Sequence, residues 1–256
     1  MSKKIVVYTA IFGSDYGLIK QPKFKDVDYI CYTDQKHFTS KIWKIVYVDP
    51  PVKNDNTRSN RYYKILPHTH LSKAYDYSVY IDGNVLIIKN IVNLVMEKMQ
   101  YGSFACFDHS KLATDSRNCI YKEYLALVNI AFTHGIYKDD LEVMKRQITR
   151  FRDENYPENN GLVTAPILIR KHFDATLINV MQHWWTIVKN ESKRDQLSFN
   201  YVIWKLNFKH FSFIPGGARK KNPWFYTMNH RKKYTSKIIK FKLKRFLHAC
   251  RDANYI

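Results

Sequence analysis

The chain has 256 residues, of which 45% are hydrophobic and 15% aromatic, so it is long and apolar enough for one large domain or two small ones and is not a disordered chain. Its 42 Lys and Arg against 22 Asp and Glu give a net charge of +20, which predicts anionic partners such as nucleic acid, nucleotides or acidic lipid headgroups. No apolar stretch has the length of a membrane span, and the first apolar run breaks at Gly13 without a cleavage site, so we interpret it as a strand and not as a signal peptide.

Strands and helices alternate over the first 110 residues. Hydrophobic, β-branched runs predict strands at 4–12, 27–33, 43–48, 77–81 and 104–107. Helical segments are expected at 60–71, where Pro67 bends or ends the helix, and at 91–100. This alternation predicts an α/β fold, a mixed and mainly parallel sheet flanked by helices.

The second half continues with longer helical segments. We expect helical structure over 119–151, a strand at 162–169, a helix at 175–188 and a helix opened by Arg194. A late strand is expected at 208–214, followed by a terminal helix over 234–253.

Polar residues follow several of these hydrophobic runs. Thr9, Asp34, Asp82 and Asn84 are each expected at the carboxyl edge of the sheet. Ligands of open α/β sheets bind beyond that edge, so these side chains are candidates for a binding site.

The segment Asp82-Gly83-Asn84 is the strongest local signal. A strand delivers a carboxylate to its end, Gly83 lets the backbone turn, and a second oxygen ligand follows at i+2. Mg²⁺ and Mn²⁺ take such oxygen ligands and bridge carboxylates to diphosphates. A plain turn closing a hairpin is the structural alternative, and such turns are common.

Three further groups of residues could carry chemistry. Arg58, Arg61 and Lys64 lie on or near one helix and could bind phosphate, although a solvated basic face would look the same. Arg194, Asp195 and Gln196 precede an apolar run, where Asp195 could contact a sugar, act as base or nucleophile, or cap a helix. The third group is His109, Arg117 and Glu123, with His109 expected on the same edge as Asp82.

Together these motifs resemble the TOD1/MUCI70 family of glycosyltransferases. The resemblance spans roughly residues 4–205 and rests on 60–68, 76–84, His109, 117–123, Gln147, 161–162 and 194–199, in matching order. It implies a GT-A-like fold and transfer of a sugar from a nucleotide diphosphate donor, with a UDP-sugar favoured and usually with Mn²⁺ or Mg²⁺. The implied acceptor is a saccharide or a lipid-linked saccharide, as in the assembly of bacterial surface polysaccharides.

The resemblance also implies roles for individual residues. Asp82 and Asn84 stand at the Asp-x-Asp metal motif of GT-A enzymes, from which Asn84 departs, and His230 is the expected third metal ligand, with His210 as the fallback. Asp195-Gln196 is similar to the Asp-Gln pair that retaining GT-A enzymes place beside the donor sugar. The catalytic candidates are Asp195, Gln196 and His109, and the acceptor or sugar candidates are Arg117, Glu123 and Arg194.

The donor nucleotide is expected on the first loop and the basic helix. The loop after the first strand would hold base and ribose, with Phe12 or Tyr16 stacking and Asp34 accepting a hydrogen bond. Positive charge beside Asp82 would stabilise the leaving diphosphate. The full candidate set for the nucleotide is Thr9, Ala10, Phe12, Gly13, Tyr16, Asp34, Arg58, Arg61, Lys64, Asp82 and Gly83.

The C-terminal tail differs from the body in charge. From Pro215 onward there are 12 basic residues and one acid, Asp252, so +11 lies in the last 42 residues and +9 in the rest. The stripe Ile239, Leu243, Phe246 and Cys250 opposite lysines describes a basic amphipathic helix. We therefore predict a transferase domain over 1–230 and a helix over 231–256 that docks on an anionic membrane, which would place the protein in the cytoplasm on the inner face; packing of the stripe on the body is the alternative.

Two other functions remain open at this point. A nucleic-acid-binding protein would suit the charge and the aromatic residues, but no RNA-binding or zinc pattern appears, so no nucleic acid is expected. A nucleotidyltransferase would also use a carboxylate-bound metal beside a nucleotide. The four cysteines, Cys31, Cys106, Cys119 and Cys250, have no metal or disulfide spacing and are expected to be free thiols.

Overall fold

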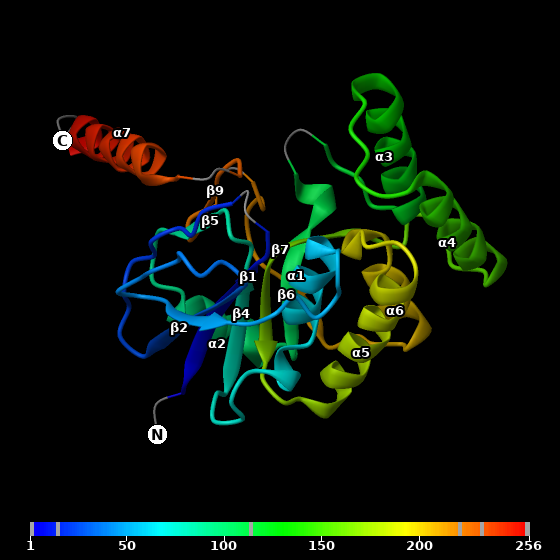
Figure 1. The fold of residues 1–256 in the computed structure, drawn as a ribbon, viewed down its shortest axis with the longest axis horizontal. Coiled ribbons are helices and arrows are strands. Elements are labelled where there is room, and N and C mark those ends of the chain that lie inside the picture. The colour runs from blue at the N-terminus through cyan, green and yellow to red at the C-terminus, as the bar shows by residue number, and fades with distance from the viewer. Residues whose placement is uncertain (1–2, 14–15, 113–114, 220–221, 231–232, 254–256) are drawn as a thin grey trace.

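Seven strands form the central sheet of the computed structural model, which describes residues 3–13, 16–112, 115–219, 222–230 and 233–253, with side chains up to Lys244 (Figure 1). The strand order is β3-β2-β1-β4-β7-β6-β8. The strands are β1 (Ile5–Ile11), β2 (Val27–Thr33), β3 (Lys44–Tyr47), β4 (Tyr77–Ile81), β6 (Phe104–Asp108), β7 (Val163–Lys171) and β8 (Phe211–Phe213). Only β7 runs antiparallel to its neighbours in this sheet. The predicted fold class, a mixed and mainly parallel sheet flanked by helices, is confirmed.

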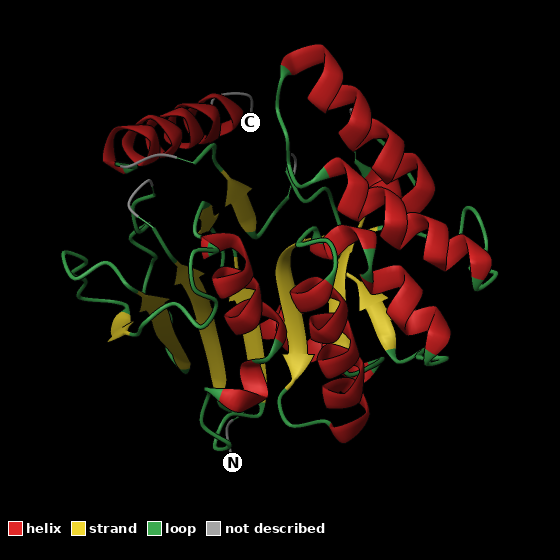
Figure 2. Cartoon of the chain, turned by 45° about the vertical axis from the view of Figure 1, so that its right-hand side comes forward, coloured by secondary structure: helices red, strands yellow, loops and turns green. Residues whose placement is uncertain are grey.

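Helices cover both faces of the sheet. They are α1 (Asn56–Ile65), α2 (Val92–Gln100), α3 (Ile120–His134), α4 (Leu141–Asp153), α5 (Ala175–Asn190), α6 (Phe199–Lys205) and α7 (Thr235–Ala253). Residues of α1, α3, α4, α5 and α6 share a core with one face of the sheet, and α2 packs on the other face. Figure 2 shows α7 and α3 above the same end of the strands, at opposite sides of the sheet.

The alternation of side chains along β1 explains the two cores. Val6, Tyr8 and Ala10 face one core, whereas Ile5 and Val7 face the other, and every residue of β1 is buried. A strand buried on both faces must be apolar at nearly every position, which is the pattern that predicted it. The strand predictions over the first 110 residues are confirmed to within two residues at each end.

Local signals set the helix boundaries. Asp55 caps α1 by accepting from the Arg58 amide, so the helix begins four residues before the predicted start. It ends before Pro67, which opens a short 3-10 turn. The predicted helical stretch 119–151 is two helices, because Gly135 takes a left-handed conformation (φ 63°) and terminates α3.

A second, two-stranded sheet was not predicted. It pairs β5 (Val85–Ile87) with β9 (Phe225–Thr227), and each strand has only three residues. The Asp82-Gly83-Asn84 segment therefore connects two different sheets, and the alternative of a hairpin turn is wrong. The helix expected to begin at Arg194 begins later, at Phe199, because a 3-10 turn (Asp195–Leu197) precedes α6.

Two expectations concerned the cysteines and membrane-spanning segments. Cys31, Cys106 and Cys119 are free and buried, as expected, whereas the side chains of Cys250 and Phe246 lie outside the described residues. Among the described residues, no helix is long and apolar enough to cross a membrane. The predicted boundary between residues 230 and 231 falls beside positions that the structure does not describe.

Candidate active site

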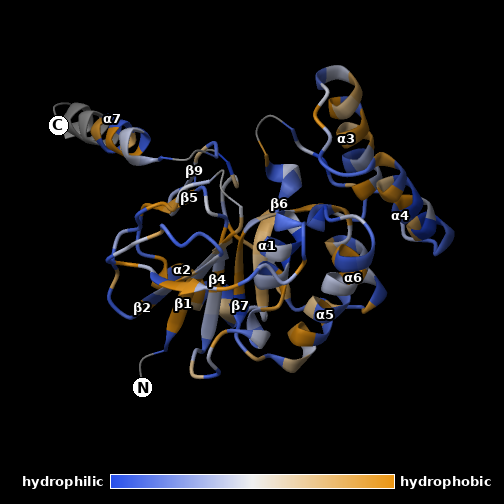
Figure 3. Ribbon diagram, viewed as in Figure 1, coloured by the Kyte–Doolittle hydropathy of each residue, from blue (hydrophilic) through white to orange (hydrophobic). Residues whose placement is uncertain are grey.

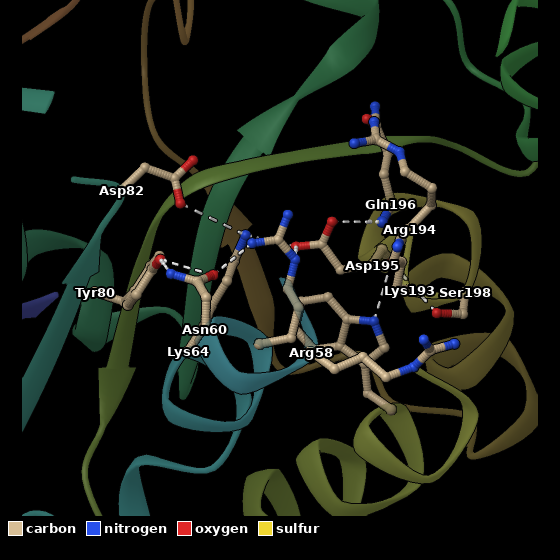
Figure 4. Close-up of polar contacts among 12 residues, drawn as sticks. Arg58, Asn60, Lys64, Tyr80, Asp82, Lys193, Arg194, Asp195, Gln196 and Ser198 are labelled. Atoms are coloured by element: carbon tan, nitrogen blue, oxygen red, sulfur yellow. Dashed lines mark hydrogen bonds and ion pairs between the residues drawn. The ribbon is translucent and has the colours of Figure 1, made fainter. Parts of the chain in front are cut away.

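Four charged side chains meet at the carboxyl edge of the sheet. Lys64 comes from α1, Asp82 from the end of β4 and Asp195 from the 3-10 turn after α5 (Figure 4). Lys64 Nζ lies 2.5 Å from Asp195 Oδ2 and 4.0 Å from Asp82 Oδ1. Arg61, also on α1, pairs with Asp195 Oδ2 through its Nε at 3.1 Å. Residues separated by up to 134 positions in the sequence are thus held in one ionic cluster.

Asp195 is the most deeply placed carboxylate of this cluster. It is 5% exposed, and its backbone carbonyl accepts a hydrogen bond from the buried Trp184 indole at 3.0 Å. Burial alone would raise the pKa of Asp195, but Arg61 and Lys64 outweigh it and hold that pKa well below the ordinary 3.8. Burial also lowers the pKa of Lys64, which Asp195 opposes. A carboxylate held by two cations is a weak base.

Asn60 and Tyr80 complete the cluster, and neither was among the predicted site residues. Asn60 Nδ2 donates to the Ala10 carbonyl at 2.6 Å and to the Tyr80 hydroxyl at 3.1 Å, while its Oδ1 accepts from Arg61 at 2.6 Å. Asn60 therefore fixes the direction of the Arg61 guanidinium. The position of Asn60 directly before Arg61 was the available sequence signal.

Gln196 connects the cluster to His109. The Gln196 side-chain amide lies 2.8 Å from His109 Nδ1, which also lies 2.6 Å from Thr164 Oγ1. His109 is 1% exposed, and its Nε2 has no hydrogen-bond partner within the described part of the chain. Burial lowers the pKa of His109 below 6.5, so its ring is neutral at pH 7. The structure therefore brings together His109 and Gln196, two of the three predicted catalytic residues.

Arg194 connects the same segment to a third group. Glu123 accepts from Arg117 at 2.6 Å and lies 3.8 Å from Arg194. Glu123 is buried, whereas Arg117 and Arg194 remain partly exposed. The predicted acceptor residues Arg117, Glu123 and Arg194 thus form one cluster. The three consecutive residues Arg194, Asp195 and Gln196 reach three different elements.

The first loop is held by Asp34. Both carboxylate oxygens of Asp34 accept from the Gly13 amide, at 3.1 and 3.2 Å. Gly13 has φ 81°, and a β-carbon there would strike the side chain of Asn56. Because both oxygens of Asp34 accept from the Gly13 amide, this carboxylate holds the loop in place.

Three other predicted donor residues are buried in the core. Thr9 lies inside β1 and not after it, and it is 1% exposed. Ala10 is buried and contributes its backbone carbonyl to Asn60. Phe12 stacks on Tyr63 with ring centroids 5.5 Å apart. The expectation that Phe12 is free to stack on a base is therefore corrected in favour of Tyr16, which is 42% exposed.

Arg58 is not part of the ionic cluster. Its guanidinium donates to the carbonyls of Val188 at 3.0 Å and Glu191 at 2.5 Å, and to Asp55 at 2.6 Å. These carbonyls belong to the last turn of α5 and its cap. Arg58 therefore joins α1 to the end of α5. Because its N–H groups are used in that contact, its predicted role in binding the nucleotide is corrected.

The predicted metal ligands lie near one another. Asp82 is 28% exposed on its side chain, and the Asn84 amide nitrogen donates to the Met228 carbonyl at 2.5 Å, which leaves the Asn84 carbonyl oxygen as a possible ligand. The side chain of His230 is exposed, yet desolvation by its neighbours lowers its pKa from 6.5, and the Asp82 carboxylate offsets this only in part. Within the described residues, no group of three or more His, Cys, Asp and Glu could hold a metal. Asp82, Asn84 and a neutral His230 nonetheless offer one carboxylate, one amide oxygen and one imidazole, which suits Mn²⁺.

The two aromatic candidates near this group also meet. The rings of Tyr16 and His230 have centroids 4.4 Å apart. His210 is not an alternative ligand, because it precedes β8 and bonds Ser103 at the opposite edge of the sheet. A β-carbon at Gly83 would come within 2.9 Å of the Ile11 side chain, so the position favours glycine.

A family model for the TOD1/MUCI70 glycosyltransferase-like domain matches residues 1–220. The chain belongs to the TOD1/MUCI70 family. It is a glycosyltransferase-like domain, and the resemblance on which the sequence interpretation rested is confirmed. A search of curated proteins finds no match.

Solved structures similar to this TOD1/MUCI70 domain are remote. The WbbM bifunctional glycosyltransferase is 12% identical over 84% of this chain and 39% of its own, with a TM-score of 0.46. GlyE of Streptococcus pneumoniae TIGR4 is 8% identical over 84% and 46%, with a TM-score of 0.42. The galactosyltransferase LgtC is 10% identical over 82% and 72%, with a TM-score of 0.39. The chain thus spans less than half the length of the first two.

Proposed function

We propose that this domain transfers a sugar from a nucleotide diphosphate donor, with a UDP-sugar favoured, to a saccharide or lipid-linked saccharide acceptor in the assembly of a surface polysaccharide. The observation that carries the proposal is the cluster of Arg61, Lys64, Asp82 and Asp195 at the carboxyl edge of the sheet. The leaving nucleoside diphosphate gains negative charge in the transition state, and Arg61 and Lys64 would stabilise it together with a bound cation.

The balance of charge in the cluster supports a divalent cation. Arg61 and Lys64 carry two positive charges, and Asp82 and Asp195 carry two negative ones, so the four cancel. A diphosphate would meet little net attraction there unless a cation accompanied it. Asp82, Asn84 and His230 would hold Mn²⁺ or Mg²⁺, which would supply Lewis-acid stabilisation of the leaving group.

The residues around Asp195 have separate tasks. Because its pKa is depressed, Asp195 orients Lys64 and Arg61 and contacts the sugar, and it does not act as a general base. Neutral His109 holds the Gln196 amide toward the same space. Arg194 and Arg117, anchored by Glu123, face the acceptor side, and Tyr16 stacks on the donor base.

The proposal is tested by a donor screen that measures nucleotide release. We expect release of nucleoside diphosphate from one activated sugar by the wild type, and loss of at least a hundredfold in Asp82→Ala, whose Tm should fall by no more than about 4 °C. Arg58→Lys is the matched control, since it alters the same helix outside the cluster. Wild-type rates in Asp82→Ala would refute the site.

The product separates this function from its rivals. A nucleotidyltransferase would release pyrophosphate and not a nucleoside diphosphate. If no activated sugar is cleaved or bound, the sugar-transfer proposal fails.

A further inference from the structure

Two helices carry large apolar side chains that the protein leaves uncovered, and both stand on the side of the sheet where the candidate site opens. On α3, Leu125 is 62% and Phe132 75% exposed, and the half-buried Val128 lies between them on the same face, with Tyr137 (62%) just beyond the helix. A second face of α3 buries Leu127 and Ala131 in the core. α3 is therefore packed on one side only.

α7 shows the same arrangement with more charge. Ile239 is 59% and Leu243 57% exposed, one turn apart. Tyr234 is buried, and Phe241 stacks on Tyr226 with centroids 3.9 Å apart, so the inner face holds the helix to the body. Residues 233–244 contain lysines and no acid, so positive charge surrounds the exposed apolar pair.

A cavity of about 720 Å³ lies beneath α7. Leu86, Ile238 and Phe241 contribute apolar surface to it. Lys20, Lys23 and Lys242 are its only charged lining residues among those described. An apolar space with a basic lining is complementary to an acyl chain that carries an anionic headgroup.

Both helices lie beyond the strand ends from which Asp82 projects. Figures 1 and 2 show α7 on one side of that edge and α3 on the other, in both views. Figure 3 shows hydrophobic residues on α3 although the helix stands away from the sheet. A ligand that touches both must be broad, and one that suits both must combine an apolar interior with an anionic surface.

We infer that α3 and α7 together dock this domain on an anionic lipid surface, with the candidate site between them facing the lipid. The lysines of α7 supply long-range attraction, and Leu125, Phe132, Ile239 and Leu243 enter the interfacial layer. The docking adds a second membrane contact, α3, to the one that the sequence predicted. This inference rests on the proposed function and deepens it, because a lipid-linked acceptor would reach the site from the lipid surface. Lipid binding is measured without donor, so it can succeed or fail independently of sugar transfer.

The first experiment is cosedimentation of the full chain with phosphatidylcholine vesicles, with and without phosphatidylglycerol. We expect the wild type to bind the anionic vesicles and to release as salt rises. Leu125→Ser with Phe132→Ser should bind about tenfold more weakly, as should Ile239→Ser with Leu243→Ser. Tyr101→Ser is the matched control, since Tyr101 is 73% exposed at the opposite edge of the sheet, and it should bind like the wild type.

The second experiment reads the position of α3 directly. Brominated lipids should quench the added emission of Phe132→Trp and leave that of Tyr101→Trp unchanged. The proposal is overturned if the α3 double variant binds vesicles like the wild type. It is equally overturned if gel filtration shows a dimer that this variant dissociates while vesicle binding persists, because the face would then bind a second copy of the chain.

Discussion

Asp195 and Asp82 lie in one cluster but differ in what their removal costs. Asp195→Ala leaves Lys64 and Arg61 buried without their carboxylate, so we expect it to lower the free energy of unfolding by about 3–5 kcal/mol. Asp82→Ala removes a partly exposed carboxylate 4.0 Å from Lys64 and should cost about 1 kcal/mol or less. Urea unfolding at pH 7 measures both losses. Equal losses would contradict the inference that Asp195 is a buried ion-pair partner and Asp82 a partly exposed one.

A compensating pair gives the control for Asp195. Lys64→Met in the Asp195→Asn background removes the stranded ammonium and should recover part of the lost stability. If the double variant is less stable than either single one, the cost lies in packing and not in charge.

One buried histidine, His172, and one partly buried histidine, His70, make the fold sensitive to mild acid. Burial lowers the pKa of His70 from 6.5 to about 3, and the pKa of His172 to about 4. Below about pH 6.5 the unfolded chain binds protons that the folded chain excludes, so stability falls as the pH drops, by up to about 1.4 kcal/mol per pH unit for each histidine. Asp195 adds to the loss only below about pH 4, because its folded pKa is depressed.

His70→Gln tests the origin of this slope. It should reduce the loss of stability between pH 6.5 and pH 4.5, measured by urea unfolding at three pH values. An unchanged slope would show that other groups set the acid sensitivity.

At the scale of elements, Arg58 stabilises a helix junction. Arg58→Ala should lower the free energy of unfolding by about 1.5–3 kcal/mol, since two carbonyls at the end of α5 lose charged donors. The KM for donor should stay near the wild-type value, whereas Arg61→Ala should raise it. A donor KM that rises in both variants alike would return Arg58 to the binding site.

The long apolar strands were predictable from the sequence, because a segment that is apolar at nearly every position must be buried on both faces. β1 is buried on both faces, and its run of β-branched residues indicated as much. β5 and β9 were missed because three residues carry no periodicity and their partners lie about 140 positions apart. The site follows the same rule. Asp82 and Asp195 stand in local motifs that single them out, whereas the contacts of Asn60 depend on strands β1 and β4, and those of Arg58 on the packing of α5 against α1.

For the whole molecule, the charge of +20 allows two kinds of anionic partner, and a thermal shift separates them. A UDP-sugar with Mn²⁺ at a hundred times its Kd should add about 2.7 kcal/mol and raise the Tm by about 5–10 °C. A single-stranded oligonucleotide should give no shift at about 0.15 M salt, where exposed charges are screened beyond roughly 8 Å. The opposite ranking would favour a nucleic-acid-binding protein.

The hydrogen bond from the Trp184 indole to the Asp195 carbonyl gives the domain an intrinsic optical probe. The Trp184 ring is fully buried against Phe199 and donates to the backbone of Asp195, whose carboxylate pairs with Lys64 and Arg61. Rearrangement of the 194–196 segment on loading would alter the surroundings of this chromophore, so we expect titration with donor to change the emission of the unlabelled protein and Trp184→Phe to abolish that signal. Occupancy could then be followed in real time, without coupling to turnover.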